Sequence, residues 1–230
     1  MPFVGSIAGA AGFGRIPANV NPFGGSIFLV GNSSTNLSVP NDADVRFGTG
    51  DFTVEWFFYQ TANGGVGRVF SLGSFPSATL AFSIQSDSAV LYVNGTNTTV
   101  GSIPVVEQFN HYAVCRSGSD LRVFLNGVQL GSTITSSDDL NNTTDVLRIG
   151  NESSVNFGTT YVGGFLTNFR WIKGSALYTS TFVVPTVPLV AVSGTKLLLL
   201  ATDAGTIVDD SSGEGKVVTN NGGTWSAQHP

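Results

Sequence analysis

The chain has 230 residues, a length that suits a single all-β domain and leaves room for a large core. Charged residues make up 11% of the sequence, against about 25% in an average domain, while hydrophobic residues make up 41%, so we expect a folded chain whose polar surface comes mostly from Ser, Thr, Asn and Gly. The net charge is -5 and the 10 basic residues are scattered singly, which argues against a nucleic-acid partner.

Residues 1–25 are rich in Gly and Ala, and we expect them to form an extended N-terminal arm rather than a strand. Phe3, Phe13 and Phe23 follow one another at regular spacing, and Arg15 is the only charged residue of the arm. These four side chains are candidates for docking onto a neighbouring protein, and the alternative is a disordered tail. The arm lacks the positive region of a signal peptide, and no apolar run in the chain is long enough to predict a membrane span.

From residue 26 onwards, short runs of β-branched and aromatic residues alternate with Gly, Asn, Asp, Ser and Pro, and helical periodicity is nearly absent. Strands without helices between them exclude the doubly wound and barrel α/β plans. We therefore predict an all-β fold, a two-sheet antiparallel jelly-roll sandwich over residues 26–230. The candidate strands are 26–30, 52–60, 68–73, 79–85, 89–93, 111–116, 121–126, 146–150, 163–173 and 195–201.

The run 52-FTVEWFFYQ-60 separates into an apolar face and a mixed face. The apolar face, expected in the core, holds Phe52, Val54, Trp56 and Phe58. The mixed face holds Thr53, Glu55, Phe57 and Tyr59. Sheets with one dry and one mixed face stack as a sandwich, which agrees with the predicted fold.

Two Asn-Gly pairs predict the turns of antiparallel hairpins. Asn94-Gly95 and Asn126-Gly127 each end an alternating run, and both suit type I′ turns, in which both central residues need positive φ. In the second hairpin, the side chains expected in the core are Leu121, Val123 and Leu125.

Four stretches carry a shared pattern: 50-GDFTVEWFFY-59, 110-NHYAVCRSGSDLRVFLNGVQLGS-132, 147-LRIGN-151 and 163-GGFLTNFRWIKGSALYTSTFVVPTVPL-189. Together they resemble the concanavalin A-like, laminin-G-like jelly-roll domains, over about residues 26 to 225. One departure is that Trp56 directly follows Glu55, where the family usually has a residue between them. The positions of the last stretch that match the family pattern are Gly164, Phe165, Arg170, Lys173, Gly174, Tyr178, Phe182 and Pro185.

The segment after the last long strand is predicted to be a structural clasp. Gly174 accepts positive φ and turns the chain out of the strand. Tyr178 and Phe182 then lay aromatic area back over the edge of the sandwich, where Pro185 and Pro188 hold an extended segment. Aromatic side chains at such spacing more often pack in a core than bind a ligand.

No constellation in the sequence predicts catalysis. Glycan hydrolysis needs two facing carboxylates, and the closest match to the related glucanases is Asp51 with Glu55, where Asp51 is better explained by turn chemistry. His111 and Cys115 share a strand face, but a thiol inside a strand is inert, so we expect Cys115 to be a small buried side chain. As the only cysteine, it can form neither an intrachain disulfide nor a cysteine-based zinc site.

Calcium is the one cofactor that the resemblance leaves open, because related domains often hold Ca²⁺ at the rim of the sandwich. Asp42 and Asp44 are the candidate ligands, although each equally suits a solvated turn. Further candidates of the same kind are the pairs Asp138-Asp139 and Asp209-Asp210.

These observations predict a protein that is not an enzyme. The leading hypothesis is a structural or surface protein of a virus particle, as a capsid decoration, fibre or tail component, because domains of this kind with a similar arm are common there. Its partners would be other virion proteins or copies of itself, with cell-surface glycans as possible contacts. The alternative is a secreted or surface lectin-like module that binds carbohydrate outside the cell. A glycan-cleaving enzyme is the least favoured hypothesis.

Overall fold

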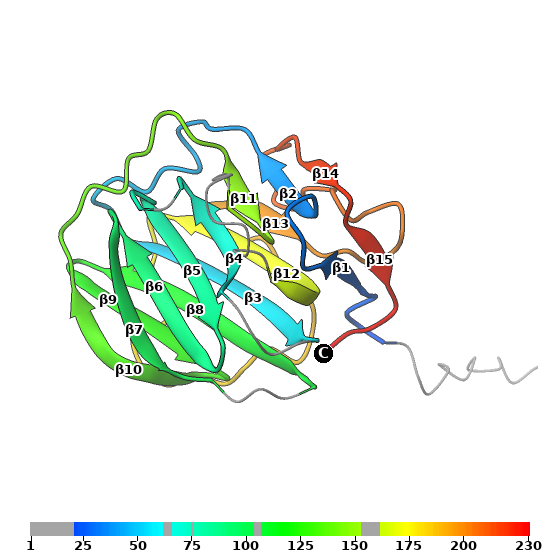
Figure 1. Ribbon diagram of the computed structural model, residues 1–230, viewed down its shortest axis with the longest axis horizontal. Coiled ribbons are helices and arrows are strands. Elements are labelled where there is room, and N and C mark those ends of the chain that lie inside the picture. The colour runs from blue at the N-terminus through cyan, green and yellow to red at the C-terminus, as the bar shows by residue number, and fades with distance from the viewer. Residues whose placement is uncertain (1–20, 62–65, 75, 104–106, 153–161) are drawn as a thin grey trace, which may run out of the picture.

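The computed structural model describes residues 21–61, 66–74, 76–103, 107–152 and 162–230. Within these ranges the strands run from β1 to β15 and form two antiparallel sheets packed face to face (Figure 1), so the predicted jelly-roll sandwich is confirmed. No helix among these residues is long and apolar enough to cross a bilayer.

Sheet A is the rear layer in Figure 1 and has the strand order β10-β9-β8-β3-β12-β1-β15, with β13 paired to β12. The bounds of its strands are β1 Ser26–Val30, β3 Phe52–Gln60, β8 Phe109–Ser117, β9 Asp120–Leu125, β10 Val128–Thr135, β12 Gly163–Lys173, β13 Thr195–Leu199 and β15 Thr224–Ser226. The long strands β3, β8 and β12 lie side by side at its centre and support the outer face described below.

Sheet B is the front layer in Figure 1 and has the strand order β14-β2-β11-β4-β5-β6-β7. The bounds of its strands are β2 Asn36–Val39, β4 Val66–Leu72, β5 Leu80–Gln85, β6 Ser88–Val93, β7 Thr96–Ser102, β11 Leu147–Ile149 and β14 Thr219–Asn221. The C-terminal return joins both sheets, because β14 pairs with β2 of this sheet and β15 with β1 of sheet A.

The core lies between the sheets and is rich in aromatic rings. Trp56 of sheet A has its ring centroid 5.4 Å from that of Phe70 and 5.0 Å from that of Phe82, both of sheet B. Edge-to-face contacts of this kind stabilise a core beyond the area that they bury. The apolar face predicted for 52–60 is confirmed, since all four of its side chains are buried.

Both predicted Asn-Gly turns are confirmed. Asn94 and Gly95 have φ values of 43° and 80° between β6 and β7, and Asn126 and Gly127 have 49° and 78° between β9 and β10. The predicted core face of the second hairpin also holds, because its three residues belong to the core or pack against it.

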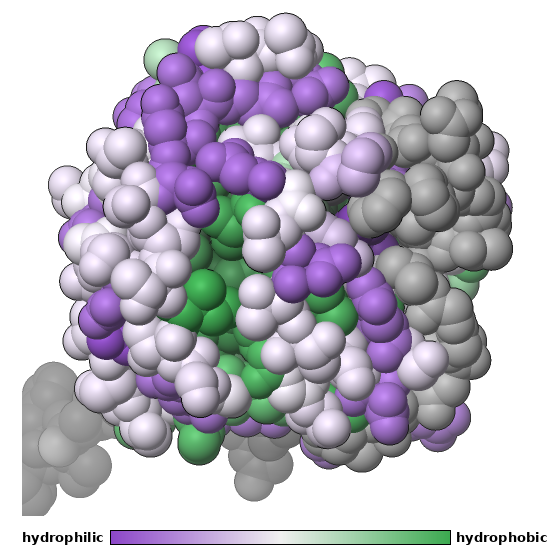
Figure 2. Space-filling view, turned by 60° about the vertical axis from the view of Figure 1, so that its left-hand side comes forward, coloured by the Kyte–Doolittle hydropathy of each residue, from purple (hydrophilic) through white to green (hydrophobic). Residues whose placement is uncertain are grey.

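The surface is made mostly of uncharged polar residues. Figure 2 looks at the side where β6, β7, β9 and β10 lie in Figure 1, and most of it is pale, the colour of Ser, Thr and Gly. Strongly hydrophilic residues gather in patches, and a band of apolar side chains lies in a furrow near the middle of this view. The pale surface agrees with the 11% of charged residues in the sequence.

Candidate functional site

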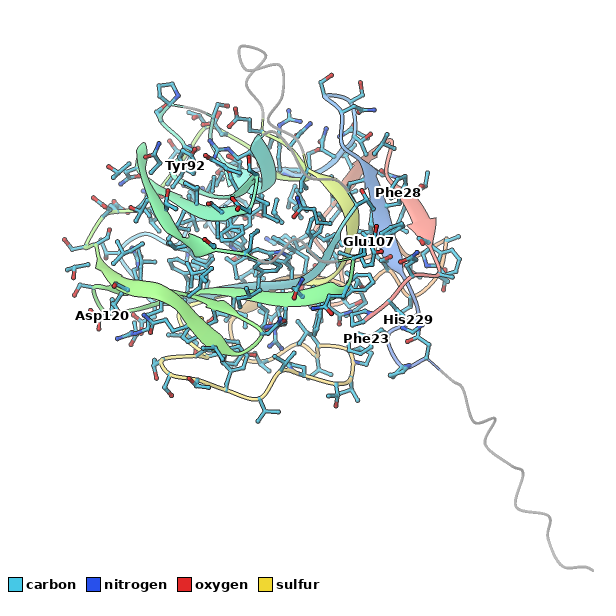
Figure 3. All side chains as sticks on the ribbon, turned by 60° about the horizontal axis from the view of Figure 1, so that its bottom comes forward. Phe23, Phe28, Tyr92, Glu107, Asp120 and His229 are labelled. Carbon is cyan, nitrogen blue, oxygen red and sulfur yellow. The ribbon has the colours of Figure 1, made fainter. Side chains whose placement is uncertain are left out.

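The clasp, residues 174–194, covers the middle of the outer face of sheet A. Gly174 leaves β12 with a φ of 87°, as predicted, and the chain then crosses beneath the sheet, which Figure 3 shows from below. The rings of Tyr178 and Phe182 stack with centroids 3.6 Å apart, and Phe182 lies 5.4 Å from Phe124 and 5.7 Å from His111. The clasp therefore covers the face of the sheet, and our expectation that it lies over the edge is wrong.

Beneath the clasp, Glu55 is fully buried and all its acceptor positions are used. Its Oε1 accepts hydrogen bonds from Arg170 Nε at 2.9 Å and Nη2 at 2.5 Å. Its Oε2 accepts one from His111 Nε2 at 3.1 Å and one from the Tyr178 hydroxyl at 3.0 Å. Burial by itself raises the pKa of Glu55, but the hydrogen bond from His111 and the charge of Arg170 outweigh it and hold the pKa below its ordinary value.

Glu55 and Asp51, the two residues considered as catalytic carboxylates for hydrolysis, both have structural roles in this geometry. Glu55 is screened from solvent and saturated with donors, so it cannot reach a glycosidic oxygen. Asp51 accepts the backbone N–H of Gly118 at 2.7 Å, so it holds the distant turn between β8 and β9, where we predicted a role in its own turn. Cys115 is buried as expected, and burial raises the pKa of its thiol to about 12, so it is not a nucleophile.

The predicted calcium ligands Asp42 and Asp44 hold a lysine. The ammonium group of Lys216 lies 2.6 Å from Asp42 Oδ2 and 2.5 Å from Asp44 Oδ2, and Lys196 lies 3.5 Å from Asp44 Oδ1. The hydrogen bond from Lys216 lowers the pKa of Asp44. A cation at these carboxylates would meet the Lys216 ammonium, so the residues present do not fit Ca²⁺.

The other acidic pairs also serve turns. Asp210 Oδ1 accepts the backbone N–H groups of Leu198 at 3.0 Å and Ser212 at 2.9 Å, and Asp138 Oδ2 accepts the Ser136 hydroxyl at 2.6 Å. Among the described residues, no three His, Cys, Asp or Glu side chains gather as a metal site would require.

Phe23 belongs to the sandwich instead of extending from it. Its ring is 4% exposed and packs edge-on against Phe57, with centroids 5.4 Å apart, so it closes the clasped face at one end. This position leaves little of the ring for a neighbouring protein. The other candidate docking residues, Phe3, Phe13 and Arg15, lie outside the described residues, and their role stays a prediction.

Beyond Phe23 the outer face of sheet A ends in a row of half-buried aromatic rings on four neighbouring strands. We call this the aromatic row, and its members are Phe28 on β1, Phe165 on β12, Tyr59 on β3 and Phe109 on β8. Consecutive centroids are 4.9, 5.6 and 5.6 Å apart. Strand pairing puts the four rings opposite one another, so the row is fixed by the sheet itself.

A hollow of about 380 Å³ opens at one end of the row. Its lining residues are Tyr59, Gln108, Phe109, Gln228, His229 and Pro230. Figure 1 shows the C-terminus beside the end of β3, and Figure 3 shows His229 near Phe23 at the same end of the sheet. The hollow thus combines two ring faces with two amides and an imidazole, all of which can donate or accept hydrogen bonds.

Residues 31–177 match the family model of the concanavalin A-like lectin/glucanases superfamily, in its laminin G form. The chain belongs to this superfamily. The match confirms the predicted resemblance and ends at Leu177, in the first residues of the clasp. Among curated proteins no sequence matches the chain.

Three solved structures illustrate the shared fold. A Bacteroides ovatus protein provisionally assigned as carbohydrate binding has a TM-score of 0.65 and 17% identity, with 87% of this chain and 60% of that one aligned. A Ruminococcus gnavus sialidase module, CBM40, bound to α2,3-sialyllactose has a TM-score of 0.50 and 11% identity, with 67% of this chain and 92% of that one aligned. Domains LG4-5 of the mouse laminin α1 chain have a TM-score of 0.51 and 15% identity, with 70% of this chain and 44% of that one aligned. At these identities the likeness shows the fold alone.

Proposed function

We propose that this protein is a lectin-like, non-catalytic module that binds carbohydrate at the aromatic row. The observation that carries the proposal is the row itself, four half-buried rings that lead into a hollow lined by amides. A sugar ring has an apolar C–H face and a rim of hydroxyl groups. The apolar face can pack on Tyr59 and Phe109, while Gln108 and Gln228 bind the hydroxyl groups.

The structural relatives support a glycan as the ligand. The Bacteroides ovatus protein is provisionally assigned as carbohydrate binding, and CBM40 is seen with a sialylated sugar. The proposal takes from them only the class of ligand, because this chain spans about three fifths of the Bacteroides ovatus protein. The proposed function includes a location of the protein outside the cell, as in our alternative hypothesis. Our leading hypothesis from the sequence, a place in a virus particle with virion partners, is supported by no observation in the structure or the comparisons and stays a prediction, while the relatives favour the alternative.

The test is a glycan array followed by affinity electrophoresis on the polysaccharides that bind. We expect the double variant Tyr59→Ala with Phe109→Ala to lose affinity by at least about tenfold, because each ring contributes stacking area. Tyr59→Phe keeps the ring and is expected to bind nearly as well as the wild type. Val183→Ala, an exposed position on the clasp, is the matched control and leaves binding unchanged.

Two results would overturn the proposal. One is that no glycan on a broad array binds the wild type. The other is that the folded double variant binds a polysaccharide as tightly as the wild type does, since the site would then lie elsewhere. A circular dichroism melt of each variant keeps loss of binding separate from loss of folding.

A further inference from the structure

Basic side chains are few in this protein, and most of those described have polar partners that hold them. Five form ion pairs with carboxylates: Arg68, Arg122, Arg170, Lys196 and Lys216. Arg116 is buried and bonds backbone carbonyls, and Arg148 donates to the side chain of Asn36. Arg46 and Lys173 also form no ion pair within the described part of the chain, and they differ from the others because both line the same hollow.

Arg46 and Lys173 are held by adjacent backbone carbonyls. Arg46 Nε donates to the carbonyl of Asp42 at 2.8 Å, and Lys173 Nζ donates to the carbonyl of Ala43 at 2.6 Å. Each side chain keeps further N–H donors beyond these bonds, because a guanidinium has five and an ammonium has three. Anchored stems with remaining donors are suited to bind a negatively charged group.

Both cations line one hollow of about 330 Å³ at the rim of the sandwich, which we call the rim hollow. Its lining residues are Ala43, Arg46, Phe47, Gly48, Thr49, Asp139, Asn141 and Lys173. Asp139 is the one carboxylate of this lining, so the charged side chains sum to one positive charge. Thr49 and Asn141 add a hydroxyl and an amide that can donate hydrogen bonds.

The floor of the rim hollow is closely packed and hydrogen-bonded. Phe47 stacks between Phe52 and Trp171, with centroids 4.2 and 4.4 Å away. Gly48 and Leu140 exchange backbone hydrogen bonds of 3.2 and 2.9 Å, which fix the two loops that form the walls. A site whose walls do not reorganise loses less free energy when a ligand binds.

We infer that the rim hollow binds an oxyanion, a carboxylate or sulfate carried by an acidic glycan. Arg46 would contact the oxyanion through its planar fork and Lys173 through its charge. The glycan part of this inference rests on the proposed function. The rim hollow lies beside the start of β3 and the aromatic row beside its end, so the two sites are roughly 20–25 Å apart and can be tested separately.

The experiment is isothermal titration calorimetry on the full chain with three oligosaccharides of equal length: hyaluronan for carboxylate, carrageenan for sulfate, and a neutral cello-oligosaccharide. We expect at least one acidic probe to bind about tenfold or more tightly than the neutral one at low salt, and this preference to shrink as salt is added. Preference for one acidic probe identifies the group bound. Equal affinity for all three would overturn the inference.

Variants locate the preference. Arg46→Gln with Lys173→Gln is expected to abolish it, while Arg122→Gln with Lys196→Gln removes the same charge from ion-paired residues and is expected to keep it. If both double variants lost the preference for the acidic probe equally, the effect would be one of general charge, and the inference would be overturned. Asp139→Asn is expected to strengthen binding of the acidic probe several-fold, because it removes the opposing charge. A decrease would argue against an oxyanion.

Free glucuronate and inorganic sulfate separate this inference from the proposed function. In a thermal-shift assay at least one of them is expected to raise the melting temperature of the wild type but not of the Arg46→Gln, Lys173→Gln variant. If this holds while the aromatic-row variant still binds neutral glycan normally, the proposed site fails and the oxyanion site stands. If neither anion changes the wild type, the oxyanion site fails by itself.

Discussion

The outer face of sheet A is built in two different ways along the same three strands. In its middle, β3, β8 and β12 present Glu55, His111 and Arg170, and the clasp covers them. At its end the same strands present Tyr59, Phe109 and Phe165, which are half-buried and have no clasp over them. The same three strands pair antiparallel through both parts, with one irregularity of β12 between Thr167 and Arg170, so the main difference lies in the side chains and in what covers them.

The contrast shows what each kind of side chain requires of its surroundings. A buried carboxylate is costly unless partners supply its charge and hydrogen bonds, so Glu55 needs Arg170, His111 and the hydroxyl that the clasp provides. Aromatic rings can remain partly in water without such a cost and can pack on a ligand. We therefore assign the covered part to stability, and the open row is the part that we propose for binding.

The largest effect is expected for Glu55→Gln, which removes one member of the covered network. It leaves Arg170 buried without its counter-charge, and loss of one partner of a buried ion pair costs about 3–5 kcal/mol. The free energy of unfolding, measured with urea, is expected to fall by that amount. Glu107→Gln is the matched control, because Glu107 is exposed near the aromatic row (Figure 3) and its change is expected to stay within about 0.5 kcal/mol.

If Glu55→Gln and Glu107→Gln were equally mild, the covered part would not stabilise the fold as we argue. Glycan binding is a second measurement on the same two variants. A folded Glu55→Gln protein is expected to retain its affinity at the aromatic row, because Glu55 does not contact the hollow there.

A smaller effect is expected for Phe182→Ala, which removes half of the stacked pair in the clasp. Fully buried Phe side chains cost about 3–5 kcal/mol when cut to Ala, and since this ring is half-buried we expect about 2–3 kcal/mol. The same change should expose the thiol beneath. Cys115 is 1% exposed in the intact protein, so Ellman's reagent is expected to label the variant at least several-fold faster than the wild type.

The Tyr59→Ala variant tells whether that labelling reports the clasp. It alters the uncovered row and is expected to leave the reactivity of Cys115 as in the wild type. Equal rates in the wild type and in Phe182→Ala would mean that the clasp does not protect this face.

Most of the fold could be predicted from the sequence, because its central strands have clear patterns. The runs at 26–30, 52–60 and 163–173 match β1, β3 and β12 residue for residue. Five strands lie outside the predicted ranges: β7 and β10 follow the two predicted Asn-Gly turns, while β2, β14 and β15 are three or four residues long and have polar or mixed sequences such as NLSV and TNN. Such strands are formed by pairing with a neighbour, and a local pattern cannot show that.

The site was less predictable, because it depends on which face is covered. Glu55 and Tyr59 are both on the mixed face of one strand, and nothing local distinguishes the buried carboxylate from the half-exposed ring. The distinction comes from the clasp, which follows more than a hundred residues later. Phe28 and Phe109 were missed, although alternation with buried neighbours such as Ile27 places Phe28 on the outer face. Asp42 and Asp44 looked like calcium ligands because Lys216 is distant in sequence.

The smallest effect is a dependence on pH that separates the two parts of the face. The pKa of Glu55 is lower in the folded protein than its ordinary value of 4.5, so its contribution to stability is complete above that pH and is lost as the pH falls through the folded value. At a pH below the folded pKa, the Glu55 side chain of the wild type is protonated and neutral, as Gln is. The difference in unfolding free energy between the wild type and Glu55→Gln is therefore expected to narrow from pH 7 to pH 3.

The comparison of the two proteins isolates Glu55, because Asp42 and Asp44 also have lowered pKa values but are present in both. Urea titrations at each pH supply the measurement. A difference that stayed constant down to pH 3 would show that the charge of Glu55 does not stabilise the covered part, and Arg170 would then be held by packing and neutral hydrogen bonds alone. Tyr59→Ala leaves the Glu55 network intact, so its effect on stability is expected to stay nearly the same across this range of pH.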